Sequence, residues 1–173
     1  MKRLFALGRL MRPHQWIKNG FVFTGLLFAH RWNEPDMLWR VVLAAAAFCL
    51  VSSVVYVLND IADRERDRSH PTKCRRPVAS GEIPVAMALG FWIILLAGGM
   101  GLGVLAGFDV VPILLVYFFL NLAYSLRLKQ VVILDVFIIA AGFMLRILAG
   151  TLGVGIPPSQ WLLLTGLMLT LFL

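Results

Sequence analysis

The chain has 173 residues, of which 60% are apolar and only 14% are charged. Soluble domains carry about 45–50% apolar and about 25% charged residues, so the composition all but excludes a soluble globular protein, a disordered chain and a fibrous repeat. The net charge of +7 would suggest a nucleic-acid partner in a soluble protein, but in an apolar chain basic residues first report membrane topology. Two cysteines are too few for a disulfide framework. The sequence therefore predicts an integral membrane protein.

Apolar segments follow one another along the chain. A transmembrane helix needs about 20 mostly apolar residues, and the sequence offers one weak candidate, which carries Lys18, and four strong ones, at residues 16–30, 38–58, 84–108, 110–126 and 131–152. A sixth run, residues 161–173, is too short to span. We therefore predict an all-α, polytopic transmembrane helical bundle. Because a chain end inside lipid would leave backbone groups without water, we expect residues 1–173 to be the amino-terminal part of a longer membrane domain.

Basic residues are distributed unevenly between the segments that these spans would separate. Thirteen of the 16 Lys and Arg residues lie before or at the start of the first span, between the second and third, or between the fourth and fifth. The positive-inside rule assigns these three segments to the cytoplasm. We expect a protein of the bacterial inner or plasma membrane whose amino terminus and loop 59–83 are cytoplasmic, with Cys49 and Cys74 as free thiols.

The long polar segment, residues 59–83, begins with a periodic set of acids. Asp60, Asp63 and Asp67 are spaced i, i+3 and i+7, so on a helix that continues the second span they would share a face about 60° wide, with Asn59 at its edge. Three carboxylates on one face repel one another unless a cation neutralises them. Mg²⁺ uses one or two carboxylates together with phosphate oxygens and water. We therefore predict the three aspartates as metal ligands and catalytic residues.

Cationic side chains follow the acids. Lys73, Arg75 and Arg76 lie between two prolines that keep this stretch out of a helix, and arginine is suited to bidentate phosphate binding. Carboxylates followed by bases describe a site for a metal–diphosphate complex. The alternative is a solvated loop whose acids and bases simply pair. The helical spacing, and a position at the membrane edge where charge is costly, favour the site.

Arg146 stands inside the fifth predicted span. An ionisable residue at that depth is a functional hypothesis by default. Asp135 would share its helix face but lie about 16 Å away along the axis, too far for a direct pair. We expect Arg146 to face the bundle interior and to meet an anionic substrate or a carboxylate of another helix. A purely structural partner inside the bundle is the alternative.

Several motifs resemble those of the UbiA superfamily of intramembrane prenyltransferases. The pattern NDxxDxxxD that begins at Asn59, followed by RRP at residues 75–77, is similar to the superfamily's first aspartate-rich motif, which lies in the cytosolic loop after the second transmembrane helix. Three further motifs are similar to those of one branch of the superfamily, the enzymes that make decaprenylphosphoryl phosphoribose. These motifs are RPxQWxKN at 12–19, HPxK at 70–73 and YSxxLK at 124–129. The resemblance covers essentially the whole chain.

The resemblance implies a nine-helix enzyme, of which this chain would hold about five and a half helices. It implies a Mg²⁺-dependent transfer of 5-phosphoribosyl from phosphoribosyl diphosphate to a polyprenyl (decaprenyl) phosphate, with release of diphosphate. The expected partners are these two substrates and membrane lipids, and a homo-oligomer is a possible assembly. No nucleic-acid partner is expected. The alternatives are prenylation of an aromatic ring, as in quinone biosynthesis, and a transporter or non-catalytic membrane subunit. The residues expected to bind substrate are Lys18, Asn19, Asn59, Lys73, Arg75, Arg76, Tyr124, Ser125, Lys129 and Arg146.

Overall fold

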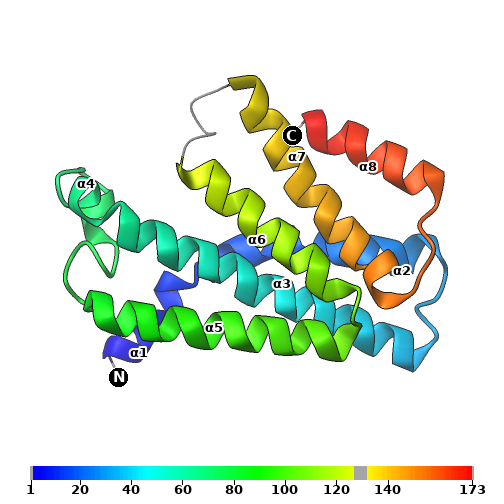
Figure 1. The fold of residues 1–173 in the computed structure, drawn as a ribbon, viewed down its shortest axis with the longest axis horizontal. Coiled ribbons are helices and arrows are strands. Elements are labelled where there is room, and N and C mark those ends of the chain that lie inside the picture. Colours follow the sequence, from blue (N-terminus) through cyan, green and yellow to red (C-terminus); the bar gives the residue numbers. More distant parts are fainter. Residues whose placement is uncertain (1, 127–131, 173) are drawn as a thin grey trace.

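The computed structural model describes residues 2–126 and 132–172, and within those residues it contains helices and connecting turns but no strand. The elements, in chain order, are α1 (Lys2–Leu10), η1 (Pro13–Phe23), α2 (Thr24–Phe28), α3 (Pro35–Ala62), α4 (Arg64–Arg68), η2 (Lys73–Arg75), α5 (Val85–Ala106), α6 (Val110–Leu126), α7 (Val132–Ala149), η4 (Leu152–Val154) and α8 (Gln160–Phe172). Figure 1 shows α3 and α5 running along the long axis, with α6 and α7 on the opposite side of α3 from α5.

Apolar helices account for most of the chain. By length and composition, three helices in the described part can cross a membrane: α3, α5 and the stretch Leu134–Val154, which contains most of α7. α6 and α8 are apolar but shorter. The predicted spans 38–58, 84–108, 110–126 and 131–152 correspond to α3, α5, α6 and α7, with small shifts at the ends.

The first predicted span differs from an ordinary α-helix. η1 is a 3₁₀ helix from Pro13 to Phe23, and only Thr24–Phe28 is α-helical. A 3₁₀ helix rises about 2.0 Å per residue instead of 1.5 Å, so η1 and α2 together extend about 30 Å, close to the hydrocarbon thickness of a bilayer. Tertiary hydrogen bonds hold this stretched segment: Trp16 Nε1 donates to Ser53 Oγ at 3.1 Å, and Asn19 Nδ2 lies 3.2 Å from Cys49 Sγ.

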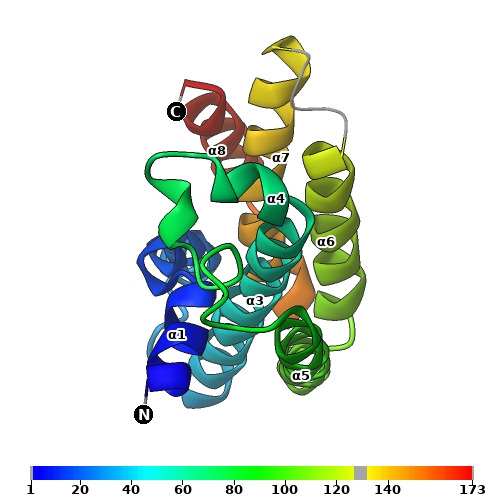
Figure 2. The ribbon, with the colours of Figure 1, turned by 90° about the vertical axis from the view of Figure 1, so that its left-hand side faces the viewer.

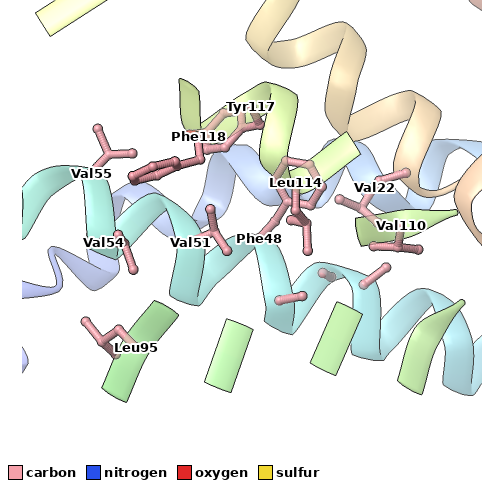
Figure 3. Close-up of a cluster of buried hydrophobic side chains, with 14 of the residues drawn as sticks. Val22, Phe48, Val51, Val54, Val55, Leu95, Val110, Leu114, Tyr117 and Phe118 are labelled. Carbon is pink, nitrogen blue, oxygen red and sulfur yellow. The ribbon is translucent and has the colours of Figure 1, made fainter. Parts of the chain in front are cut away.

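α3 is the central helix of the bundle. It packs most extensively against α5, and it also contacts η1 and α6. Phe48 and Val51 of α3 are fully buried, and Figure 3 shows them among the side chains of α6, including Leu114 and Tyr117. Lipid tails are as apolar as these side chains, so the helices associate through close packing. A Cβ on Gly99 of α5, for example, would lie 2.8 Å from Val51 Cγ2.

The sequence supplies the start of α3. Pro35 occupies the first turn, where backbone N–H groups have no partner within the helix, so the N–H that proline lacks costs no hydrogen bond. Asp36 lies beside the positive end of the helix dipole. Glu34, just before the helix, accepts hydrogen bonds from Arg31 at 2.7 and 2.5 Å. These bonds lower the pKa of the Glu34 carboxyl.

The segment between α4 and α5 folds back onto the bundle. Val78 and Ile83 are almost fully buried, and the Ile83 N–H donates to the Pro77 carbonyl at 2.9 Å. Gly81 makes the intervening turn at φ 80°, a conformation that glycine adopts without strain. These buried contacts fix the position of Arg76, the residue before Pro77. The segment lies at the same end of the bundle as α1 and α4 (Figure 2).

Candidate active site

Two of the three predicted aspartates, one at the end of α3 and one on α4, are buried beside two arginines. Asp60 and Asp67 are each only 2% exposed. Arg12 Nη2 donates to Asp60 Oδ1 at 2.5 Å. Arg76 Nη1 lies 2.7 Å from Asp67 Oδ2 and 3.4 Å from Asp60 Oδ1. Arg76 therefore bridges the two carboxylates, and the two guanidinium groups balance their charge.

The third aspartate, Asp63, marks a break in the helix. α3 ends at Ala62, and Asp63 caps it with φ −88° and ψ 4° before α4 begins at Arg64. The Asp63 side chain is 37% exposed and pairs with Arg66 at 3.9 Å. The prediction of one continuous helix face is therefore wrong, because the backbone leaves helical values at Asp63. Over the described residues, no group of three His, Cys, Asp or Glu side chains is assembled that could hold a metal ion.

The two buried carboxylates nevertheless suit a hard divalent cation. In the part of the chain that the structure describes, hydrogen bonds and ion pairs engage Oδ1 of Asp60 and Oδ2 of Asp67, which leaves the second oxygen of each carboxylate. Asn59, the neighbour of Asp60, adds an amide oxygen that accepts a hydrogen bond from Ser125 Oγ at 2.5 Å. Mg²⁺ takes one or two carboxylates, with phosphate and water oxygens completing its octahedron. The donor set fits that ion without a third carboxylate.

Exposed cations lie close by in the chain. Lys73 and Arg75 are on η2, and both are exposed to solvent. Among residues 2–126 and 132–172, ion pairs involve other basic side chains and neither of these two. His70 Nδ1 accepts from the backbone N–H groups of Thr72 and Lys73 at 3.3 and 3.4 Å, which orders the start of η2. Lys73 and Arg75 therefore keep their positive charge available to an anion.

A cavity of about 110 Å³ opens inside the bundle, between η1, α3, α6 and α7. Its lining contains two cations and no carboxylate. Tyrosine hydroxyls and a carboxamide supply further polar groups. The polar lining residues are Lys18, Arg146, Tyr56, Tyr117, Tyr124 and Asn121.

Arg146 enters this cavity with neutral partners only. It is 6% exposed, and it donates to Asn19 Oδ1 at 2.7 Å, to the Gly142 carbonyl at 2.7 Å and to Tyr117 Oη at 2.9 Å. Its guanidinium carbon also lies 4.8 Å from the centre of the Tyr117 ring, a cation–π contact. No carboxylate of the described residues pairs with it, and Asp135 instead accepts from Tyr124 Oη at 2.7 Å. The cavity therefore contains a buried positive charge that has no counter-ion among residues 2–126 and 132–172.

The cavity and the acid pair adjoin each other. Tyr56 lines the cavity and lies one helical turn before Asp60 on α3. The Arg12 guanidinium lies 5.0 Å from the centre of the Tyr56 ring while it donates to Asp60. On α6, Tyr124 lines the cavity and its neighbour Ser125 donates to Asn59. These contacts make the two parts one continuous site.

The backbone of Arg12 is strained. Its φ of 52° and ψ of 60° lie in the left-handed region, which costs an L-residue about 1–2 kcal/mol. Pro13 disfavours the ordinary helical conformation of the residue before it. The ion pair with Asp60 and the contact with the Tyr56 ring offset this strain, so the Arg12 guanidinium is held at the acid pair.

The structure brings most of the predicted site residues together. Residues at the end of α3 and in the following segment surround the acid pair, and residues of η1, α6 and α7 surround the cavity. Asp63 is partly exposed and pairs with Arg66, Lys73 and Arg75 lie on the neighbouring η2, and Lys129 lies outside the described residues. The predicted residues that the contacts join to the acid pair or the cavity are Lys18, Asn19, Asn59, Asp60, Asp67, Arg76, Tyr124, Ser125 and Arg146.

Four residues of the site were not predicted. Arg12 was interpreted only as a topology charge and as part of the RPxQWxKN motif. Tyr117 and Asn121, together with Tyr124, are spaced i, i+4 and i+7 on the apolar α6, which places three polar side chains on one face. Tyr56 precedes Asp60 by four residues, so it also shares a face with a predicted ligand. Both spacings could have indicated these residues from the sequence.

Comparison with known families and relatives adds a second line of evidence. Residues 20–173 match the UbiA prenyltransferase family. The decaprenyl-phosphate phosphoribosyltransferase of Corynebacterium glutamicum is 38% identical over 170 residues, which cover 95% of this chain and 51% of that protein. The protein of the same name from Mycolicibacterium smegmatis is 36% identical over 163 residues, covering 92% of this chain and 51% of that protein. The chain thus spans about half the length of these relatives.

A solved structure supports the fold. A UbiA homologue from Archaeoglobus fulgidus, bound to GPP and Mg²⁺, matches with a TM-score of 0.77 at 23% identity, covering 99% of this chain and 60% of that chain. This likeness confirms the predicted all-α transmembrane bundle, and the family match confirms the resemblance carried by the motifs. The chain is an integral membrane protein and belongs to the UbiA prenyltransferase family.

Proposed function

We propose that this protein is a Mg²⁺-dependent transferase that moves 5-phosphoribosyl from phosphoribosyl diphosphate to a polyprenyl phosphate such as decaprenyl phosphate. One observation carries the proposal: the cations of the site form two adjoining sets. Arg12 and Arg76 lie beside the acid pair, and Lys18 and Arg146 lie in the cavity. The donor has two anionic ends, a diphosphate on C1 and a phosphate on C5, which suit these two sets.

The acid pair would receive the diphosphate end. Asp60 and Asp67 would hold Mg²⁺ with the help of Asn59, and Asp63 remains a predicted metal ligand. Arg76 and the exposed η2 cations would bind the diphosphate oxygens. Bound Mg²⁺ would supply Lewis-acid stabilisation of the charge that develops on the departing diphosphate. The relatives' names and the Mg²⁺ in the Archaeoglobus fulgidus structure agree with this assignment.

The cavity would receive the 5-phosphate end. Lys18 and Arg146 would neutralise the phosphate, and the hydroxyls of Tyr56 and Tyr117 with the amide of Asn121 would hydrogen-bond to the ribose. A prenyl diphosphate has one anionic end and an apolar chain, so it would leave the buried Arg146 charge unmatched. A buried charge without a partner is costly, and this favours the phosphorylated sugar over a prenyl donor.

The proposed transfer exchanges one C1–O bond of the ribose for another. The C1–O bond to diphosphate breaks with its electron pair leaving on diphosphate, and a new C1–O bond forms to an oxygen of the acceptor phosphate. That oxygen is anionic at neutral pH, so no general base is required. Preorganised cations beside the leaving group stabilise the transition state by electrostatics. The positive charge of residues 1–18 and 59–83 supports a cytoplasmic position for this end of the bundle.

Membranes that contain the protein test the proposal. Given radiolabelled phosphoribosyl diphosphate, decaprenyl phosphate and Mg²⁺, they should form a lipid-linked phosphoribose and free diphosphate. Asp60→Asn should greatly reduce formation of the product when Mg²⁺ is limiting. Glu65→Gln is the matched control, because Glu65 lies on the adjacent α4 with its side chain 73% exposed. Consumption of prenyl diphosphate alone, with a hydroxybenzoate-type acceptor, would instead identify the protein as an aromatic prenyltransferase.

A further inference from the structure

The short amino-terminal helix α1 is apolar on two opposite faces. Ala6 and Leu10 are fully buried against the bundle. Leu4 and Phe5 point away from it and are 74% and 71% exposed. An exposed leucine and phenylalanine side by side form the kind of apolar patch that marks a contact surface. This helix is not among the predicted elements, and the proposed reaction does not use it.

The direction of α1 indicates which surface it meets. Figure 1 shows α1 at the end of the bundle that also carries α4 and the start of α5. In Figure 2, where α5 is seen nearly end-on and α3 runs obliquely, α1 runs across the view. Nine residues of α-helix are about 14 Å long, roughly half of what a membrane crossing requires. α3 and α5 are long and apolar enough to cross a bilayer, so a short helix that runs across them at one end of the bundle has the orientation expected of a helix at the bilayer surface.

The outer face of α1 combines apolar walls with positive charge. Leu4, Phe5, Gly8, Arg9 and Pro13 line an open hollow of about 390 Å³. Arg9 at the hollow forms an ion pair with Glu82, which ties α1 to the segment before α5. Apolar side chains flanked by basic ones are typical of helices that lie in the headgroup region of a bilayer.

We propose that α1 is an interfacial anchor that binds anionic phospholipid of the leaflet next to the active site. Leu4 and Phe5 enter the acyl region, the hollow takes the upper part of an acyl chain, and the exposed Arg3 faces the headgroup phosphates. A second copy of the chain is disfavoured as the occupant, because a two-fold contact through this face would bring the basic side chains of both copies together. Only Met11 separates α1 from Arg12, so the anchor also directs the chain into the site.

Spin labelling in lipid vesicles tests this placement. A nitroxide is attached at Phe5→Cys in a variant whose native cysteines are replaced, Cys49→Ser and Cys74→Ser. The matched control carries the nitroxide at Arg66→Cys, because Arg66 lies at the same end of the bundle and is 77% exposed. Collision with oxygen and with a water-soluble nickel complex is measured in phosphatidylcholine vesicles with and without phosphatidylglycerol. At position 5 the ratio of oxygen to nickel accessibility should exceed that at position 66 severalfold, and should rise further with phosphatidylglycerol.

The charge is tested by removing it. Arg3→Gln should lower the preference of the segment for phosphatidylglycerol about fivefold, the effect of one basic side chain near an anionic surface. Nickel accessibility at position 5 equal to that at position 66, in both vesicles, would overturn the anchor. Spin–spin broadening between copies would assign the face to a second chain. Equal immersion with and without phosphatidylglycerol would overturn the anionic-lipid assignment. Leu4→Cys repeats the measurement at a second exposed position, so one poorly folded variant does not decide it.

Discussion

Replacement of Arg146 separates a substrate-binding role from a structural one. Arg146→Met removes the charge and keeps a long apolar side chain, whereas Arg146→Lys keeps the charge without the planar fork. The guanidinium donates three hydrogen bonds to neutral acceptors at 2.7–2.9 Å. Each such bond contributes about 1.5–3 kcal/mol, but burying the charge costs several kcal/mol. These opposing effects nearly cancel, so the free energy of unfolding of Arg146→Met should stay within about 2 kcal/mol of wild type.

Donor binding should respond much more strongly. Truncating one partner of a buried charge pair costs about 2–5 kcal/mol, so the Kd for phosphoribosyl diphosphate should rise about 30-fold or more in Arg146→Met. Ligand-induced thermal stabilisation of the purified protein, measured with Mg²⁺, reports this change. Donor at 100 times the wild-type Kd stabilises wild type by about 2.7 kcal/mol, and the same concentration should stabilise the variant by about 0.9 kcal/mol or less.

The two roles give opposite patterns of results. Arg146→Lys should bind the donor with intermediate affinity. A variant Arg146→Met that unfolds several kcal/mol more easily, yet gains as much stability from the donor as wild type does, would refute the reasoning. Arg146 would then be a structural residue with its neutral partners.

Three further predictions concern packing, topology and the metal. Gly150→Ala should destabilise the protein by about 3 kcal/mol or more, because its Cβ would lie 1.7 Å from a carbonyl oxygen of η1. Gly90→Ala is the control, because a Cβ at Gly90 meets open space. Thermal unfolding of both variants in detergent checks this, and equal stability of the two would contradict the packing. A membrane-impermeant maleimide should label Cys74 in inverted membrane vesicles and not in intact cells, and labelling of intact cells would reverse the orientation. Asp60→Asn should raise the Mg²⁺ concentration for half-maximal activity at least about tenfold, and Asp63→Asn should raise it less; equal shifts in a Mg²⁺ titration would contradict the pairing of the buried acids.

Hydropathy predicted the long helices because lipid leaves the chain few alternatives. Backbone groups in a bilayer must be satisfied within the segment, so an apolar run of sufficient length is enough to predict α3, α5, α6 and α7. The 3₁₀ winding of η1 was not predictable in this way. It depends on bonds to distant residues, such as Trp16 to Ser53 on α3, and local sequence does not encode them. α1 was missed because it is short and apolar on two faces.

The site was predictable where local spacing determines geometry. The spacing predicted that Asp60 and Asp67 lie together, and the structure joins them through Arg76 although the helix breaks between them at Asp63. Asp63 lies off the predicted helix face because α3 ends at Ala62. The chain then folds back and buries Val78. Arg12 reaches Asp60 only because η1 packs on α3, so its role required the tertiary structure.

Comparing the affinities of whole and partial ligands tests the central claim most directly. The purified protein with Mg²⁺ is titrated with phosphoribosyl diphosphate, with inorganic diphosphate and with ribose 5-phosphate. If two sets of cations hold the two ends of one donor, phosphoribosyl diphosphate should bind far more tightly than either fragment, and each fragment should displace it. Inorganic diphosphate that binds as tightly as phosphoribosyl diphosphate would contradict the account, because the cavity around Lys18 and Arg146 would then contribute nothing to donor recognition.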